Sequence, residues 1–142
     1  MFYNCTAEAN PVELNDNVDQ NNEPWSEDQL MQPSDLASIL NEPIKNNIYI
    51  FNIGPSGSIK NSIEIGPTED KNSIEKLKHE ASKLPKYADI VIYCGCCPFD
   101  KCPNIRPAFN LLNEMDFINH KLLNISKNLK VNWIDNGFPI NE

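Results

Sequence analysis

Apolar residues along the chain occur with two spacings, and each spacing predicts one kind of secondary structure. Runs rich in β-branched and aromatic residues predict strands over residues 48–53, 88–93 and 121–125, and strict alternation predicts a short edge strand over 62–65. The stretch Ile90–Tyr93 is apolar without interruption, which is typical of a strand covered on both faces. Such strands are usual in parallel sheets.

Helices are predicted between these strands by apolar residues three and four positions apart. Each expected helix follows a polar residue whose side chain suits the N-cap position. These residues are Ser26 for a short turn, Ser34 for a helix through Leu40, Asn72 for a helix that Pro85 ends, and Asn104 for a helix through Met115. Strands that alternate with helices predict an α/β domain with a central, mainly parallel sheet flanked by helices.

Charge divides the chain into two parts. The net charge is −8, and residues 1–44 carry nine acidic side chains but no Lys or Arg. Residues 1–24 are also poor in branched apolar residues, so we expect a flexible acidic leader there, followed by one folded domain over 25–142. The rest of the chain is nearly neutral and has no basic patch, which argues against a nucleic-acid partner.

The chain has no apolar run near the roughly 20 residues that span a bilayer. Its start, from Met1 to Cys5, lacks the basic and apolar regions of a signal peptide. We therefore expect a soluble protein with no membrane span. The compartment stays open, because a cytoplasmic protein and an exported one whose signal peptide is absent from this chain have the same appearance.

Four of the five cysteines lie between Cys94 and Cys102, where a predicted strand joins a predicted helix. Thiols so close in sequence cannot link distant segments, so they indicate reactive or metal-binding sulfur, with disulfides inside the loop as an alternative. Ligands bind parallel sheets beside the carboxyl ends of the strands, and a helix N-terminus favours an anion. Both features favour a cysteine thiolate at this position.

Several segments of the chain resemble the rhodanese family. They are Ile90–Cys94, Arg106–Ala108, Leu111-Leu112 and Trp133–Ile140, which look like the family's buried strand with its active-site cysteine, its following helix and its closing Trp…Gly-x-Pro signature. The upstream resemblance is weaker, because Asn52 and Gly54 stand where rhodaneses usually carry Asp and Arg, and Ser58 stands in place of His. The cysteine loop is also longer than the usual rhodanese pattern.

The resemblance implies a rhodanese-like fold and a sulfurtransferase without metal or cofactor. Such an enzyme moves sulfane sulfur from a small anion such as thiosulfate to an unidentified thiol or protein acceptor. Counted from the strand, the nucleophile that carries the persulfide is Cys94; counted back from the helix, it is Cys97. We expect Cys94, with Cys97 as the second choice, because a strand end fixes a position more rigidly than the interior of a loop does. The implied substrate-binding residues are Gly95, Cys96, Cys97, Phe99, Lys101 and Arg106, and Cys96, Cys97 and Cys102 are the implied resolving or accessory thiols.

Two other interpretations stay open. Four thiolates suffice for a tetrahedral zinc ion or an iron–sulfur cluster, although zinc sites usually combine two separated ligand pairs. The missing upstream polar residues favour instead a non-catalytic rhodanese-like module for binding or redox sensing, with a Cys94–Cys97 or Cys96–Cys102 disulfide. We expect His79 and His120 to be solvated and not to act as ligands.

Overall fold

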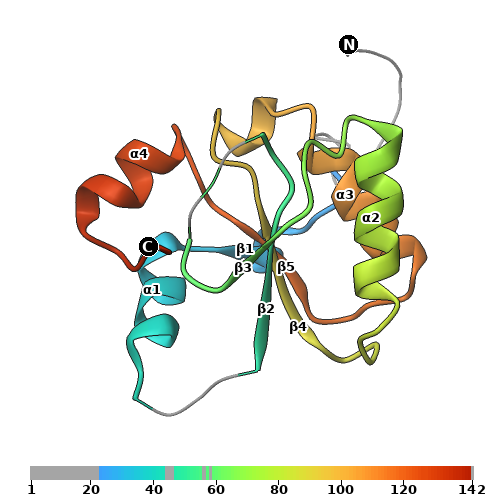
Figure 1. Cartoon of the computed structure of the whole chain (residues 1–142), viewed down its shortest axis with the longest axis horizontal. Coiled ribbons are helices and arrows are strands. Elements are labelled where there is room, and N and C mark those ends of the chain that lie inside the picture. Colours follow the sequence, from blue (N-terminus) through green and yellow to red (C-terminus); the bar gives the residue numbers. More distant parts are fainter. Residues whose placement is uncertain (1–22, 44–46, 56, 58, 142) are drawn as a thin grey trace, which may run out of the picture.

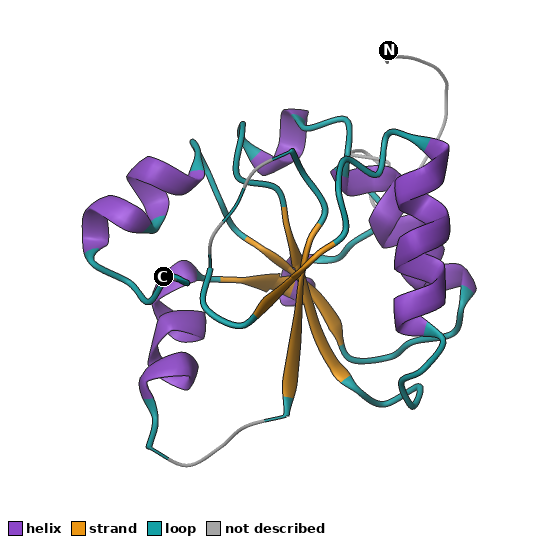
Figure 2. Ribbon diagram, viewed as in Figure 1, coloured by secondary structure: helices purple, strands orange, loops and turns teal. Residues whose placement is uncertain are grey.

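The computed structural model describes residues 23–43, 47–55, 57 and 59–141, which form an α/β fold around a five-stranded sheet (Figure 1; Figure 2). Every pairing between the five strands is parallel, and the strand order is β1-β5-β4-β2-β3. Outside the sheet, Ile59 and Ile140 form an isolated antiparallel bridge. The strands are β1 (Leu30–Met31), β2 (Ile48–Asn52), β3 (Ser62–Glu64), β4 (Asp89–Tyr93) and β5 (His120–Leu123). The predicted parallel sheet and the edge position of β3 are confirmed.

Helices cover both faces of this sheet (Figure 1). They are α1 (Pro33–Asn41), α2 (Lys71–Ala81), α3 (Ile105–Glu114) and α4 (Leu129–Asn132), with 3₁₀ turns η2 (Glu27–Gln29), η3 (Phe99–Lys101) and η4 (Ile134–Asn136). Helices α2 and α3 lie side by side on one face, and α1 and α4 lie on the other. Among the described helices, none has the length and apolar character needed to cross a membrane.

Strand β4 takes part in both hydrophobic cores of the fold. Ile90 and Ile92 belong to the core beneath α2 and α3, whereas Val91 and Tyr93 belong to the core beneath α1 and α4. All four side chains are buried, as expected for alternate residues of a strand covered on both faces. The carboxyl end of β4, and with it the residue that follows, is therefore held from two sides.

The helix starts predicted from capping residues were wrong for two helices. α1 begins at Pro33, because proline has no N–H to leave unpaired at the first helical position, and Ser34 therefore lies inside the helix. α2 begins at Lys71 with Asp70 as its N-cap, so Asn72 also lies inside the helix. This helix ends at Ala81, several residues before the proline that was expected to end it.

Residues 1–22 of the acidic leader predicted for residues 1–24 lie outside the described residues, and Cys5 is one of them. Glu23 and Pro24 are described, and both contact α3. The Glu23 carboxylate pairs with Arg106, and the Pro24 carbonyl oxygen accepts a hydrogen bond from the Asn113 side chain at 3.0 Å. The end of the acidic segment thus packs on the domain.

His120 is buried, which corrects the expectation that it is solvated. It is the first residue of β5; its ring centroid lies 4.6 Å from that of Phe109, and its Nε2 lies 2.6 Å from Asn113 Oδ1. Burial lowers the pKa of its imidazole, so the neutral form is favoured in this part of the core. His79 is exposed on α2, as expected.

Candidate functional site

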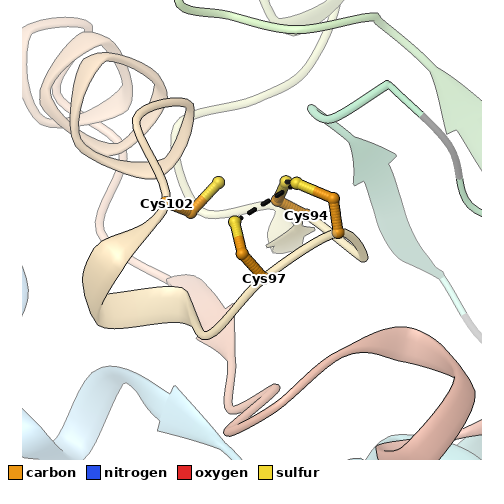
Figure 3. Close-up of side chains that lie close together, drawn as sticks. Cys94, Cys97 and Cys102 are labelled. Carbon is orange, nitrogen blue, oxygen red and sulfur yellow. Dashed lines mark hydrogen bonds between the residues drawn. The ribbon is translucent and has the colours of Figure 1, made fainter.

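The clustered cysteines lie in the loop between β4 and α3, at the carboxyl edge of the sheet. Cys94 directly follows the last residue of β4, and Cys102 lies shortly before α3. The loop folds back, so the sulfur atoms of Cys94, Cys97 and Cys102 face a common space (Figure 3). Together with Cys96 they form the thiol cluster (Cys94, Cys96, Cys97 and Cys102), whose Sγ atoms all lie within 4.8 Å of one another.

Backbone hydrogen bonds to the segment after β5 hold the loop in this folded-back path. The Leu129 N–H donates to the Gly95 carbonyl oxygen at 2.9 Å, and the Phe99 N–H donates to the Ile125 carbonyl oxygen at 3.0 Å. The Phe99 ring, in the turn η3, also packs against Trp25, with ring centroids 5.9 Å apart. The thiol cluster therefore rests on a loop that is anchored at several points.

The four thiols differ in exposure. Cys94 and Cys102 are buried, Cys97 is partly exposed and Cys96 is exposed. The Cys96 Sγ atom lies 3.3 Å from Cys94 Sγ and 3.2 Å from Cys97 Sγ. Cys96 and Cys97 thus form the solvent side of the cluster, with Cys94 behind them.

Asn104 directs its side-chain amide at two of the sulfur atoms. Its Nδ2 donates to Cys94 Sγ and to Cys102 Sγ, at 3.7 Å each. The Glu69 N–H donates to Asn104 Oδ1 at 2.9 Å and fixes the orientation of the side-chain amide, while the Thr68 hydroxyl donates to the backbone carbonyl oxygen of Asn104. Within the described residues this side chain makes no cap hydrogen bond, although Asn104 directly precedes α3 as predicted. The contact with sulfur was not predicted from the sequence, because an Asn directly before a helix is already expected there as an N-cap.

The loop after β2 approaches the thiol cluster at Gly54. A Cβ atom at this position would lie 2.5 Å from Cys94 Sγ, which is too close for any side chain without displacement of the sulfur. The Gly54 N–H donates to Asn52 Oδ1 at 3.1 Å, and Asn52 Nδ2 donates to Glu64 on β3 at 2.6 Å. Of the three positions that depart from the rhodanese pattern, Gly54 therefore borders the site and Asn52 holds its backbone, whereas Ser58 lies outside the described residues.

The surroundings of the sulfur atoms favour a thiolate on Cys94. Hydrogen bonding from the Cys102 thiol, with further donors on Cys96 and Asn104, lowers the pKa of Cys94 to about 5 and outweighs burial, which acts in the opposite direction. Burial, followed by contacts with Cys97 and Cys94, raises the pKa of Cys96 to about 12. Donation to Cys94 raises the pKa of Cys102. At neutral pH the negative charge is thus placed on Cys94, while Cys96 and Cys102 stay protonated.

Of the two cations predicted to bind substrate, Arg106 already has a partner. Its Nη2 lies 2.6 Å from one Glu23 carboxylate oxygen, and its guanidinium lies over the Trp25 ring. Lys101 is exposed on η3. The structure therefore brings the predicted cysteines together, whereas Phe99 packs on Trp25 and Arg106 faces a carboxylate.

Comparisons with known proteins show the fold. A scan against models of known families finds no match, and a search among curated proteins finds none either. A variant of EanB in complex with hercynine superimposes with a TM-score of 0.56 at 13% identity, over 80% of this chain and 27% of that chain. A rhodanese-related protein from Thermoplasma volcanium superimposes with a TM-score of 0.52 at 17% identity, over 79% of this chain and 96% of that chain. The fold is rhodanese-like.

The rhodanese-like fold confirms what the sequence resemblance implied about the architecture. This chain spans only 27% of the length of the EanB chain that it matches, whereas it spans nearly the whole of the Thermoplasma volcanium protein. In this rhodanese-like sheet β4 pairs with β2 on one side and β5 on the other, and Cys94 stands at its carboxyl end. Ligands of open α/β sheets bind at that edge.

Proposed function

We propose that this chain is a sulfurtransferase that carries sulfane sulfur as a persulfide on Cys94. The observation that supports the proposal best is a cysteine directly after the inner strand β4 of a rhodanese-like sheet, with hydrogen-bond donors directed at its sulfur. Its pKa of about 5 makes it a thiolate at neutral pH, and the thiolate is the nucleophilic form of cysteine. We therefore prefer Cys94 to Cys97 as the nucleophile.

The proposed reaction has two steps, each a displacement at sulfur. In the first step the Cys94 thiolate attacks the outer sulfur of thiosulfate. A new S–S bond forms, the S–S bond of thiosulfate breaks, and sulfite leaves with the electron pair. In the second step an acceptor nucleophile, such as cyanide or a thiolate, attacks the outer sulfur of the persulfide and the Cys94 thiolate leaves. One sulfur atom has moved, and the free thiolate is restored.

The neighbours of Cys94 have distinct roles in this proposal. Donors from Cys102 and Asn104 stabilise negative charge on the inner sulfur, as the N–H groups of an oxyanion hole stabilise an oxyanion. The outer sulfur extends toward the exposed side of the cluster, where Cys96 and Cys97 lie. From there an acceptor can reach it, and either accessory thiol can receive it in a thiol–persulfide exchange.

A thiosulfate-to-cyanide transfer assay on the reduced, metal-free chain tests the proposal. We expect turnover by the wild type and by Cys5→Ser, reduced turnover by Cys97→Ser, and background activity for Cys94→Ser. Mass spectrometry after incubation with thiosulfate alone should show a gain of one sulfur atom in the wild type and no gain in Cys94→Ser. The Cys5→Ser variant is the matched control, since its cysteine lies outside the loop in sequence.

Two results would contradict the proposal. Full turnover by Cys94→Ser would reject Cys94 as the nucleophile. A folded wild type that neither turns over nor gains sulfur would instead favour a non-catalytic rhodanese-like module for binding or redox sensing.

A further inference from the structure

The thiol cluster has the dimensions of a site for one metal ion. A tetrahedral zinc ion with Zn–S bonds of about 2.3 Å holds its four sulfur atoms about 3.8 Å from one another. In this chain all four Sγ atoms lie within 4.8 Å of one another, and two of the distances are 3.3 and 3.2 Å. Small side-chain adjustments would therefore bring the four atoms to the distances that one ion requires.

The path of the loop allows four ligands from one short stretch of sequence to surround a single ion. Zinc sites usually combine ligand pairs from separate segments, whereas all four thiols here belong to one short stretch of sequence. The turn η3 lies between Cys97 and Cys102, and the sulfur atom of Cys102 faces that of Cys94 across the common space (Figure 3). One loop thus presents its sulfur atoms from opposite sides.

Asn104, a polar neighbour of the thiol cluster, donates hydrogen bonds of the kind that metal-bound thiolates accept. Asn104 is 4% exposed, and its amide donates to two of the four sulfur atoms while the Glu69 N–H fixes its orientation. Hydrogen bonds of this kind orient the ligands of metal sites and tune their charge. The four candidate ligands are therefore accompanied by an oriented hydrogen-bond donor that holds two of them in place.

We infer that the thiol cluster binds a single thiophilic metal ion, with Zn²⁺ as the best-fitting ion, through Cys94, Cys96, Cys97 and Cys102. Sulfur ligands select against Mg²⁺ and Ca²⁺, which bind oxygen. The short sulfur–sulfur distances favour one ion over a multi-iron cluster, because the thiolates of such a cluster bind different iron atoms and lie farther apart. Each cysteine that enters as a thiol releases its proton to solvent.

Metal binding goes beyond the proposed sulfur transfer and does not depend on it. It needs all four sulfur atoms, whereas persulfide formation needs Cys94 alone. A thiolate bound to Zn²⁺ shares its charge with the ion and is a weaker nucleophile. The zinc-loaded chain should therefore take no sulfur from thiosulfate until a chelator removes the ion, so metal binding and sulfur transfer are alternative states of one site.

Co²⁺ is the probe for this inference, because its visible absorption reports tetrahedral geometry and its near-ultraviolet absorption reports thiolate ligands. The full chain, reduced and free of metal, is titrated with Co²⁺ without oxygen and then with Zn²⁺. We expect both absorptions to saturate at one ion per chain and to disappear when an equal amount of Zn²⁺ is added.

Serine variants at the exposed side of the cluster test the ligand set. Cys96→Ser and Cys97→Ser should bind Zn²⁺ more than about 100-fold more weakly than the wild type, because loss of a ligand exceeds the 10–100-fold cost of losing a supporting group. Cys5→Ser should bind as tightly as the wild type. Because Cys96 and Cys97 are not buried, these variants keep the test valid if Cys102→Ser fails to fold.

Three outcomes would overturn the inference. These are the absence of thiolate-to-Co²⁺ absorption, wild-type Zn²⁺ affinity in both Cys96→Ser and Cys97→Ser, and assembly of a multi-iron cluster when iron and sulfide are offered together with Zn²⁺. Sulfur transfer measured on the metal-free chain separates the two proposals. Turnover without Zn²⁺ binding rejects only the metal site, and Zn²⁺ binding without turnover rejects only the sulfurtransferase.

Discussion

At the scale of single residues, Cys94 differs from its neighbours because two opposing influences act on its thiol. Burial behind Cys96 and Cys97 disfavours a charge, whereas hydrogen bonds from Cys102, Cys96 and Asn104 favour one. The hydrogen bonds prevail and lower the pKa of Cys94 to about 5. Its reactivity is therefore set by the donors around it and not by its exposure.

We expect the metal-free chain to hold a Cys94 thiolate at neutral pH. Because the pKa in the folded chain lies below the usual cysteine value of about 8.5, the thiolate is present above pH 5 and is lost as the pH falls through that value. Thiolate ultraviolet absorbance measured against pH should show a step near pH 5 in the wild type and in Cys5→Ser, but not in Cys94→Ser. A first step near pH 8.5 in the wild type would contradict this prediction.

A methyl group at Gly54 should disable the site, because its Cβ would lie 2.5 Å from Cys94 Sγ. We expect Gly54→Ala to lower kcat/KM for sulfur transfer more than tenfold and to lower the free energy of unfolding by about 1–3 kcal/mol through overpacking. Steady-state kinetics and urea unfolding measure the two effects.

Gly137→Ala is the matched control for this substitution. Gly137 has φ +73°, and no described atom lies within 4 Å of a Cβ built there, so alanine costs about 1–2 kcal/mol of backbone strain without touching the site. Equal losses of activity in the two variants would mean that Gly54 acts through stability alone.

At the scale of elements, long periodic segments were predictable and short ones were not. β2, β4 and α3 each repeat their apolar pattern over several residues, so the sequence predicts them nearly as they stand. β1 has two residues and α4 has four, which is too short for either period to appear, and neither was predicted. β1 is a strand because Leu30 and Met31 pair with β5, which is a long-range property.

The candidate site likewise has one part that the local sequence predicts and one part that depends on distant residues. The position of Cys94 followed from the end of the apolar run of β4, and this part of the prediction needed only local pattern. The approach of Cys102 to Cys94 depends on backbone hydrogen bonds between the loop and Ile125 and Leu129. Such bonds use groups that nearly every residue has, so no residue type signals them.

The ion pair between Glu23 and α3 suggests a test of substrate binding. Because Glu23 neutralises Arg106, Glu23→Gln should leave the charge of the guanidinium uncompensated while its contacts with Trp25 and the Asp100 carbonyl oxygen remain. We expect KM for thiosulfate to fall by up to about fivefold, which corresponds to the roughly 1 kcal/mol of a partly exposed ion pair, with kcat unchanged. The effect should shrink at high salt. Arg106→Gln should raise KM.

Asp135→Asn provides the control for this ion pair. It breaks the Lys130–Asp135 pair of α4 and η4, which has an N–O distance of 3.0 Å, and should leave KM unchanged. An unchanged KM in both Glu23→Gln and Arg106→Gln would show that Arg106 does not bind the donor.

At the scale of the whole molecule, the site is built where three strands end. The parallel sheet brings the carboxyl ends of β2, β4 and β5 to one edge, so Gly54, Cys94 and Ile125 follow adjacent strands. Gly54 limits the space beside Cys94, and Ile125 anchors the loop through Phe99. The sulfur atoms come from one loop, but their arrangement depends on the fold as a whole.

Because the loop is tied to these strand ends, an ion in the thiol cluster should stabilise the entire fold. An ion that binds only the folded chain adds about 2.7 kcal/mol at a concentration of 100 Kd, which corresponds to a rise in Tm of roughly 10 °C for a chain of this size. Thermal unfolding of the reduced chain should show this rise with Zn²⁺ for the wild type and Cys5→Ser. Cys97→Ser should lack this rise in Tm.

An ion that binds the unfolded thiols equally well gives no rise, since only preferential binding to the folded state shifts the equilibrium. An unchanged Tm in the wild type would therefore show that the ion does not bind the folded cluster in preference to the unfolded thiols.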